Sequence, residues 1–342
     1  MTISATAVEA AVVDMMESVF AEYRDAHPPS NTVERDPQLW ETLDQLGLVR
    51  LTGAEAAGGS GAGWHEAAEL LSAAVRHGVR IPLAEHDLLA CWLLEATGLA
   101  TDAAVRTVCV LDGTGTAKAV PWAATSDRVV VVWHDEEGLR VADVETGSLR
   151  ITPGANMIGE PRDVVAADIG KLRGELLAPE LVAQLGLRSA LVRAIQVCAA
   201  NDRALGLSID HAASRVQFGR PLAKFQAVQN LISDMAGEAA LARAATEAAL
   251  NAAVASDWSA AGVEFLIAVA RSCAGHAASV VVRNAHQVHG AIGTTREHRL
   301  HEFTRAALTW RSEFGSVRHW DDNLTDAALR AGGAGLWPLI TG

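Results

Sequence analysis

Three long segments with helical patterning occupy most of the second half of the chain, and they restrict its fold more than any other feature. Apolar and alanine residues recur with helical spacing over about residues 180–214, 222–255 and 259–289. Each segment is about 30 residues long, and alanine-rich helices of this length pack closely against one another. The pattern therefore predicts an antiparallel helical bundle.

The connection between the first two segments carries a distinctive set of side chains. It contains the run Gln217–Pro221, QFGRP, in which the glycine permits unusual backbone angles and the proline disfavours helix at the residue before it. A tight turn is therefore predicted at one end of the helix pair. A guanidinium, two amides and an aromatic ring suit a pyrophosphate group beside an aromatic base. We expect the turn to present these groups together on Arg215, Gln217, Phe218 and Gln226.

A second motif lies about seventy residues downstream, at Gln287–Gly293 with the sequence QVHGAIG, followed by Thr295, Glu297 and Arg305. Together with the first motif, in this order, it resembles the acyl-CoA dehydrogenase family of flavoproteins. The family's second consecutive glycine is Ala291 in this chain. The alternative interpretation is a helical hairpin with a Gly-Pro turn and no ligand. The resemblance implies FAD as the cofactor, bound by Arg215, Gln217, Phe218, Gln226, Gln287 and Gly290.

The rest of the chain agrees with the three-part architecture of that family. Helical patterns cover about residues 4–24, 37–46, 64–77 and 84–97, and valine-rich runs punctuated by glycine follow from about residue 104. These runs predict a small antiparallel β domain. We therefore expect a mainly α protein with a small central β domain: an N-terminal helical domain (1–104), a middle domain like a β-barrel or sandwich (105–177), and a C-terminal four-helix bundle (178–342).

A glycine-rich segment at residues 58–63 offers a competing phosphate site. Such a loop can cradle phosphate with its backbone N–H groups, but no Lys-Ser/Thr pair follows it and no strand pattern directly precedes it. We interpret the segment as a flexible loop before a helix.

Composition excludes several other classes of function. The formal net charge of −13 argues against general binding to nucleic acid or to anionic membranes. The four cysteines are far apart and stand in apolar stretches, so neither a disulfide framework nor a metal site is predicted. No basic segment precedes the first apolar stretch, and no uncharged apolar run suggests a membrane span. We expect a cytoplasmic protein.

The catalytic base of the family is missing from both places where the resemblance puts it. The family removes a proton from C2 of an acyl-CoA thioester with a glutamate, while hydride leaves C3 for the flavin. Phe314 stands seventeen residues after Glu297, where most members have this glutamate, and Val216 follows Arg215, where a minority have it. Glu313 is one residue away, and a shift of one residue rotates a helical side chain by about 100°. We interpret Glu313 as a solvated surface residue, with a displaced base as the alternative.

The resemblance extends to the way in which FAD is shared between subunits. In this family one subunit holds the flavin ring, and its neighbour binds the adenine and pyrophosphate. The Glu-Pro-x-x-Gly-Ser-Asp-like segment that supports the ring has no counterpart here, because Asp112–Gly115 is a plain turn and Thr125–Asp127 lacks the Glu-Pro pair. The chain therefore resembles the shorter, base-lacking subunit of bacterial hetero-oligomeric acyl-CoA dehydrogenases, some of which degrade steroids or other bulky acyl groups.

Three hypotheses follow from these observations. The first is a subunit that binds the ADP half of FAD and needs a second acyl-CoA dehydrogenase subunit, an acyl-CoA substrate and an acceptor such as electron-transfer flavoprotein. The second is a self-sufficient acyl-CoA dehydrogenase that uses Glu313. The third is a scaffold with the fold but without flavin.

Overall fold

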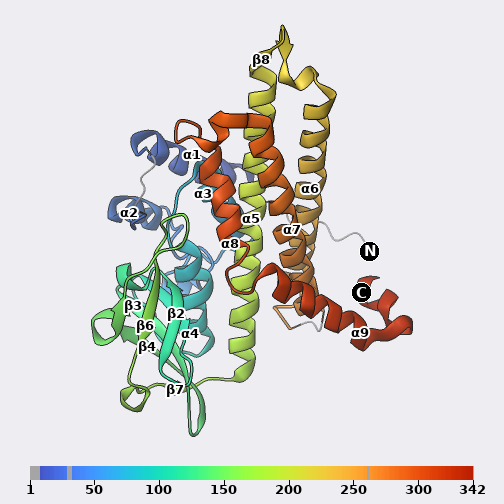
Figure 1. Cartoon of the computed structure of the whole chain (residues 1–342). Coiled ribbons are helices and arrows are strands. Elements are labelled where there is room, and N and C mark those ends of the chain that lie inside the picture. The colour runs from blue at the N-terminus through green and yellow to red at the C-terminus, as the bar shows by residue number, and fades with distance from the viewer. Residues whose placement is uncertain (1–7, 29–32, 260–261, 342) are drawn as a thin grey trace. The chain divides into compact units, whose positions relative to one another are not determined.

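The computed structural model describes residues 8–28, 33–259 and 262–341. These residues form two compact units, the first ending at Arg188 and the second beginning at Ser189 (Figure 1). The elements change from helix to strand between Ala96 and Arg106, and back to helix at Pro179. These changes lie close to the predicted boundaries, although the contacts place the first helices and the strands in one unit. The division into three domains stays a prediction.

Helices begin the first unit. Asp36 accepts hydrogen bonds from the backbone N–H groups of Gln38 and Leu39, which makes it the N-cap of the next helix, and Pro37 occupies the first helical position. The part of the first predicted helix at residues 4–7 lies outside the described residues. The helices are α1 (Ala10–Ala26), α2 (Pro37–Gln45), α3 (Trp64–His77), the π-helix η2 (Ala84–Cys91) and α4 (Trp92–Ala96).

Two small sheets complete the first unit, one ordered β1-β3-β4-β7 and the other β2-β6-β5. The prediction of a wholly antiparallel domain is wrong in one respect, because β1 pairs in parallel with β3. Between these two strands the chain passes through β2 in the other sheet, so β3 returns in the direction of β1. The strands are β1 (Arg106–Val110), β2 (Thr116–Pro121), β3 (Arg128–Asp135), β4 (Gly138–Glu145), β5 (Arg150–Thr152), β6 (Arg162–Ala166) and β7 (Glu175–Leu176).

The continuous valine run of β3 is explained by burial on both faces. Val129 and Val131 pack in a core that includes residues of both sheets. Val130 and Val132 pack in a second core, together with Leu93 and Leu94 of the helical region. A strand covered on both sides has no polar face, so its sequence does not alternate.

The second unit is a helical bundle. Its long helices are α5 (Pro179–Ser214, from Ser189 onward), α6 (Gln226–Ala255) and α7 (Val263–His289), followed by α8 (Leu300–Trp310) and α9 (Val317–Thr341). Figure 1 shows α5, α6 and α7 side by side, with the strand β8 beyond one end. Ala212, Met235, Val281 and Phe303 pack together from four of these helices. The predicted mainly α fold with a central β region and a C-terminal four-helix bundle is confirmed.

Two helical segments, Pro179–Ser214 and Val263–Thr294, are long and apolar enough to cross a membrane by length and composition alone. In their most apolar windows, 61% and 50% of the residues are buried within the structure. Core helices of a bundle have the same length and character, so this evidence for a membrane span is weak. The expected absence of a membrane span stays a prediction.

Candidate functional site

The two sequence motifs line one cavity at an end of the helical bundle. The cavity has a volume of about 920 Å³ and is open to solvent. We call it the two-motif cavity, because the first motif contributes the end of α5 and the segment after it, and the second contributes the end of α7 and the segment after that. Its lining consists of His211, Ser214, Arg215, Gln217, Leu222, Gln287, Val288, His289, Gly290, Ala291, Ile292, Thr295 and His298.

A short hairpin shapes the first motif. The sequence predicts a tight turn between α5 and α6. In the structure this turn is the tip of a hairpin formed by two strands of two residues each, β8 (Val216–Gln217) and β9 (Arg220–Pro221). Both loop residues have positive φ, Phe218 at 51° and Gly219 at 77°. Two consecutive positive φ angles match the right-handed twist of the flanking strands, and this arrangement favours glycine at the second position.

A backbone reversal shapes the second motif. Helix α7 ends at His289, and Gly290 follows with φ 62° and ψ −140°, a combination that residues with a Cβ rarely adopt. A Cβ at Gly290 would meet no atom within 4 Å, so the glycine is required by its backbone angles and not by close packing. The 3₁₀-helix η7 (Gly290–Thr294) then leads to Thr295 and His298 in the cavity lining.

Three polar side chains of the cavity remain available for a ligand. The guanidinium of Arg215 forms no hydrogen bond or ion pair with the residues that the structure describes, and neither do the side-chain amides of Gln217 and Gln287. Arg215 is the only arginine or lysine, and no carboxylate is present, among the described residues of the lining. The cavity therefore suits an anionic ligand that also accepts hydrogen bonds.

Two of the predicted FAD-binding residues lie outside this lining. Phe218, at the tip of the hairpin, is 92% exposed, and its ring packs edge-on against Phe225 at 6.2 Å between ring centroids. The side chain of Gln226 donates a hydrogen bond to Asn230 along the exposed side of α6. The structure therefore brings Arg215, Gln217, Gln287 and Gly290 together, while Phe218 and Gln226 face elsewhere.

Three histidines outside the predicted set of site residues gather in the same cavity. The ligand-capable atoms of His211, His289 and His298 all lie within 4.8 Å of one another. Burial, and then the neighbouring histidines, lower the pKa of His289 to about 4. Burial also lowers the pKa of His211, with smaller effects from His298 and Arg215, and it lowers that of His298 with a smaller effect from His301. Burial therefore favours the neutral form of all three rings.

The positions expected to hold the catalytic base lie outside the cavity lining. Phe314, with φ 50°, belongs to the segment between α8 and α9, and Val216 is exposed on β8. The interpretation of Glu313 as a solvated residue is wrong, because its side chain is only 17% exposed and accepts a hydrogen bond of 2.8 Å from Nε of the buried Arg193. A buried guanidinium on α5 needs a counter-charge, and Glu313 supplies it.

A second buried arginine fixes the backbone around Glu313. One nitrogen of Arg271 donates to the carbonyl oxygens of Arg311, Glu313 and Gly315 at 2.7 to 3.1 Å. Burial, and then the positive charge of Arg193, lower the pKa of Arg271 to about 10, so the guanidinium stays charged at pH 7. Residues 311–315 are therefore held in one conformation by two arginines from α5 and α7.

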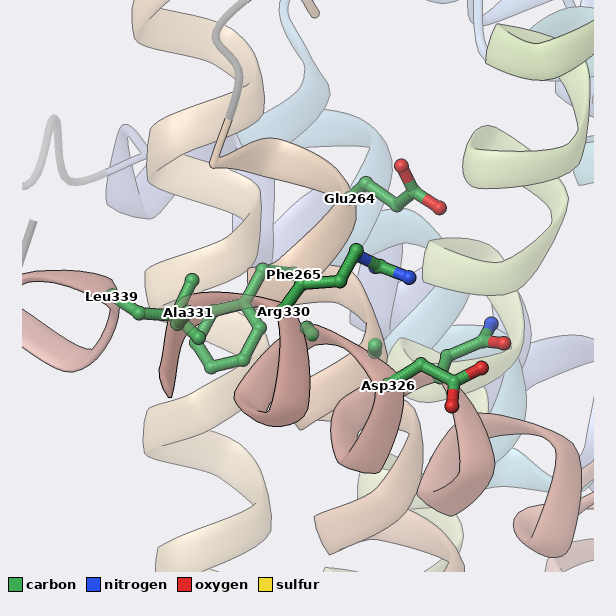
Figure 2. Close-up of a pocket in the computed structure, with 9 residues that line it drawn as sticks. Glu264, Phe265, Asp326, Arg330, Ala331 and Leu339 are labelled. Atoms are coloured by element: carbon green, nitrogen blue, oxygen red, sulfur yellow. The ribbon is translucent and has the colours of Figure 1, made fainter. Parts of the chain in front are cut away.

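A second cavity of about 480 Å³ lies between the start of α7 and the end of α9 (Figure 2). Figure 2 shows Phe265 between the two helices, with the charged ends of Glu264, Arg330 and Asp326 extending toward the same side. Charges of both signs line it, and neither sequence motif contributes to it. None of the predicted FAD-binding residues and neither base position lines this second cavity.

The glycine-rich loop at residues 58–63 is not available for phosphate. The backbone N–H groups of Ser60, Gly61 and Ala62 donate to the carbonyl oxygens of residues 50, 53 and 51. A Cβ at Gly59 would lie 2.1 Å from the carbonyl oxygen of Gly53, so this glycine permits close backbone approach. Backbone hydrogen bonds hold the loop, and its N–H groups are therefore not free to bind a phosphate.

Comparison with known proteins agrees with the fold and with the motifs. Residues 186–317 match the model of the acyl-CoA dehydrogenase C-terminal domain. The chain is similar to acyl-CoA dehydrogenase IpdE2 of Mycolicibacterium smegmatis, with 27% identity over 80% of this chain and 82% of the relative. IpdE2 of Mycobacterium tuberculosis is 34% identical over 35% of each chain, so that match covers about a third of the relative's length.

Solved structures extend the similarity to nearly the whole chain. The crystal structure of the ChsE4-ChsE5 complex from Mycobacterium tuberculosis contains a chain that matches with a TM-score of 0.82 and 21% identity, over 95% of this chain and 98% of that one. Likeness at this identity shows the fold alone, while the C-terminal domain match adds sequence evidence. The chain therefore has the acyl-CoA dehydrogenase fold, and its residues 186–317 match the C-terminal domain of that family.

Proposed function

We propose that this chain is a subunit of an FAD-dependent acyl-CoA dehydrogenase, that it binds the ADP half of a shared FAD, and that it desaturates acyl-CoA only together with a second subunit. One observation supports the proposal above all: both motifs line one cavity with cationic and amide groups that have no partner in the described part of the chain, while no carboxylate stands at either base position. The chain thus combines residues suited to a dinucleotide with the loss of the residue that removes a proton.

The residues of the two-motif cavity fit the ADP half of FAD. Arg215 offers a guanidinium that can form paired hydrogen bonds with the pyrophosphate. Gln287 and Gln217 offer amides for the adenine or ribose, and Gly290 leaves open space where a Cβ would stand. When bound, FAD supplies the hydride acceptor of the desaturation. The exposed ring of Phe218 is suited to contact with a cofactor or residues presented by another chain.

The remaining chemistry belongs to the second subunit in this proposal. The groups that support the flavin ring and the glutamate that removes the C2 proton come from that chain, whose own pocket surrounds the acyl group. The similarity to a chain of the ChsE4-ChsE5 complex supports an assembly of two different acyl-CoA dehydrogenase chains. The substrate class is an acyl-CoA from fatty acid or steroid degradation, and we expect a cytoplasmic enzyme that passes electrons to an electron-transfer flavoprotein or a similar acceptor.

The ion pair of Glu313 weighs against a self-sufficient enzyme. A general base must have a lone pair directed at the substrate proton, and the carboxylate of Glu313 is already bonded to Arg193 in a segment that Arg271 fixes. A scaffold would not explain why Arg215 has no partner among the described residues, or why a Cβ at Gly290 would meet open space. Both alternatives nevertheless give distinct experimental results.

The visible absorption spectrum of purified protein tests the proposal. The chain is expressed alone and also together with a second acyl-CoA dehydrogenase chain that carries the family glutamate. We expect little flavin in the chain alone and stoichiometric FAD in the co-purified complex. Flavin that is bound by the single chain and bleached by acyl-CoA would support the self-sufficient enzyme instead. Absence of flavin from every assembled pair would support the scaffold.

A further inference from the structure

Three imidazoles in the two-motif cavity form a cluster that the proposed function does not explain. His211 lies near the end of α5, His289 is the last residue of α7, and His298 follows η7. Their ligand-capable atoms all lie within 4.8 Å of one another. Three nitrogen ligands that converge beside an open cavity are the arrangement of a transition-metal site with a free coordination position.

The buried member of the cluster is oriented like a metal ligand. Nδ1 of His289 lies 2.8 Å from the carbonyl oxygen of Ala285 and donates its proton to it, which leaves the lone pair on Nε2. His289 is 5% exposed, and its Nε2 is buried without a hydrogen-bond partner among the described residues. A backbone carbonyl that fixes one ring nitrogen while the other stays unprotonated is typical of metal-binding histidine.

The two other rings supply lone pairs from more exposed positions. The ring of His211 is stacked on that of His289, with centroids 4.5 Å apart, and it has no hydrogen-bond partner among the described residues. The centroid of His298 lies 4.6 Å from that of His289. Nδ1 of His298 accepts the backbone N–H of Leu300 at 3.1 Å, so coordination through Nε2 moves the proton to Nδ1 and gives up this hydrogen bond.

We propose that His211, His289 and His298 bind one divalent transition-metal ion of the zinc class, with a fourth position open to the cavity. Zinc–nitrogen bonds of about 2.0–2.1 Å place the nitrogens of a tetrahedral site about 3.3 Å apart. Metal binding therefore shortens the separations between the ligand nitrogens from at most 4.8 Å, and rotations of the partly exposed side chains of His211 and His298 allow this. The open position takes water or an anionic oxygen such as that of a phosphate.

The site has no local sequence signature. Zinc motifs are recognised by ligands two to five residues apart, whereas these histidines come from three separate elements. The bundle brings them together because α5 and α7 end at the same cavity. The three ligands all come from this chain, so the site does not depend on the proposed FAD assignment.

Metal titration of the full-length, untagged, chelator-treated chain tests the proposal. Zinc affinity is measured by competition with a chromophoric chelator, and the visible absorption of added Co²⁺ reports the coordination geometry. We expect one ion per chain with a Kd of about 1 µM or tighter. His211→Ala and His298→Ala should each weaken binding by at least about 100-fold. His276→Ala, which removes an exposed histidine of α7 outside the cluster, should leave the affinity unchanged.

The shift in Tm on adding zinc provides a second test, which applies even if a variant folds poorly. Zinc should raise the Tm of the unchanged chain and of His276→Ala, but not that of the double variant His211→Ala/His298→Ala. A Kd weaker than about 100 µM in the unchanged chain would overturn the proposal. Equal affinity in the double variant would overturn it as well. FAD is absent from these measurements, so failure of the FAD assignment does not change their outcome.

Discussion

The two-motif cavity and the segment 311–315 belong to the same helical unit, yet they use their polar groups in opposite ways. In the cavity, the side chains of Arg215, Gln217 and Gln287 have no partner among the described residues. In the segment, Glu313 is paired with Arg193, and Arg271 occupies three backbone carbonyls. Polar side chains without partners beside an open cavity indicate a ligand-binding site. Polar side chains that already bond to other residues of the fold indicate a structural role.

The largest effect should come from removing the charge partner of Arg193. In Glu313→Leu the buried guanidinium keeps its charge and loses its counter-charge, and breaking such a pair by removing one partner costs about 3 kcal/mol. The measurement is the free energy of unfolding in urea. Glu264→Leu, at a carboxylate of the second cavity, serves as a control and should change stability much less. Equal losses of unfolding free energy in the two variants would mean that the ion pair with Arg193 does not contribute specifically to stability.

The next effect concerns the cavity itself. Arg215→Ala in the assembled complex should weaken FAD binding by about 10- to 100-fold, because a hydrogen bond to a charged group contributes about 1.5–3 kcal/mol. Arg215→Lys should restore only part of this loss, since an ammonium lacks the paired geometry. Arg318→Ala, on an exposed side chain of α9, is the matched control. Unchanged FAD retention in Arg215→Ala would contradict the assignment of this residue.

A pair of glycines separates backbone strain from helix propensity. Gly290→Ala forces a Cβ residue into φ 62°, ψ −140°, and should destabilise the chain by about 1–3 kcal/mol. Gly237→Ala lies inside α6 with no atom within 4 Å of the added Cβ, and should stabilise it by up to about 1 kcal/mol. Unfolding in urea measures both. If Gly290→Ala is as stable as the unchanged chain or more stable, the backbone reversal after α7 is not strained.

The smallest expected effects fall on catalysis. Glu313→Gln keeps a hydrogen-bond acceptor for Arg193, so turnover of the assembled complex should stay within about twofold. A loss that approaches about 100-fold would revive the displaced-base hypothesis. Phe314→Glu in the single chain should create no activity, because in the proposed function the residues that support the flavin ring belong to the second subunit. Steady-state assays with acyl-CoA and an artificial electron acceptor measure both variants.

The fold could be predicted where local pattern decides it. The spacing of apolar residues predicted α2, α3, α5 and α6 to within a few residues. The parallel pairing of β1 with β3 could not be predicted, because it depends on which sheet the intervening strand joins. The β8–β9 hairpin was missed because two-residue strands leave no periodic signal.

The candidate site was predictable to the extent that it resides in contiguous motifs. Arg215, Gln217, Gln287 and Gly290 were placed in one site from two sequence runs, and the structure brings them to one cavity. The pairing of Glu313 with Arg193 was not predictable, since the two residues are 120 positions apart and neither belongs to a motif. The cluster of three histidines was not predictable either, because only His289 belongs to a motif and the cluster forms only when α5 and α7 end at the same cavity.

Turnover by the single chain tests the central claim most directly. The purified chain, saturated with FAD, is assayed with acyl-CoA and an artificial acceptor. The same assay is applied to the proposed complex with a second subunit, and to that complex with the family glutamate of the second subunit replaced by glutamine. A general base contributes about 10²–10⁴-fold to the rate. We therefore expect activity in the intact complex and a loss on that scale both in the single chain and in the glutamine complex. Turnover by the single chain at the rate of the complex would contradict the account.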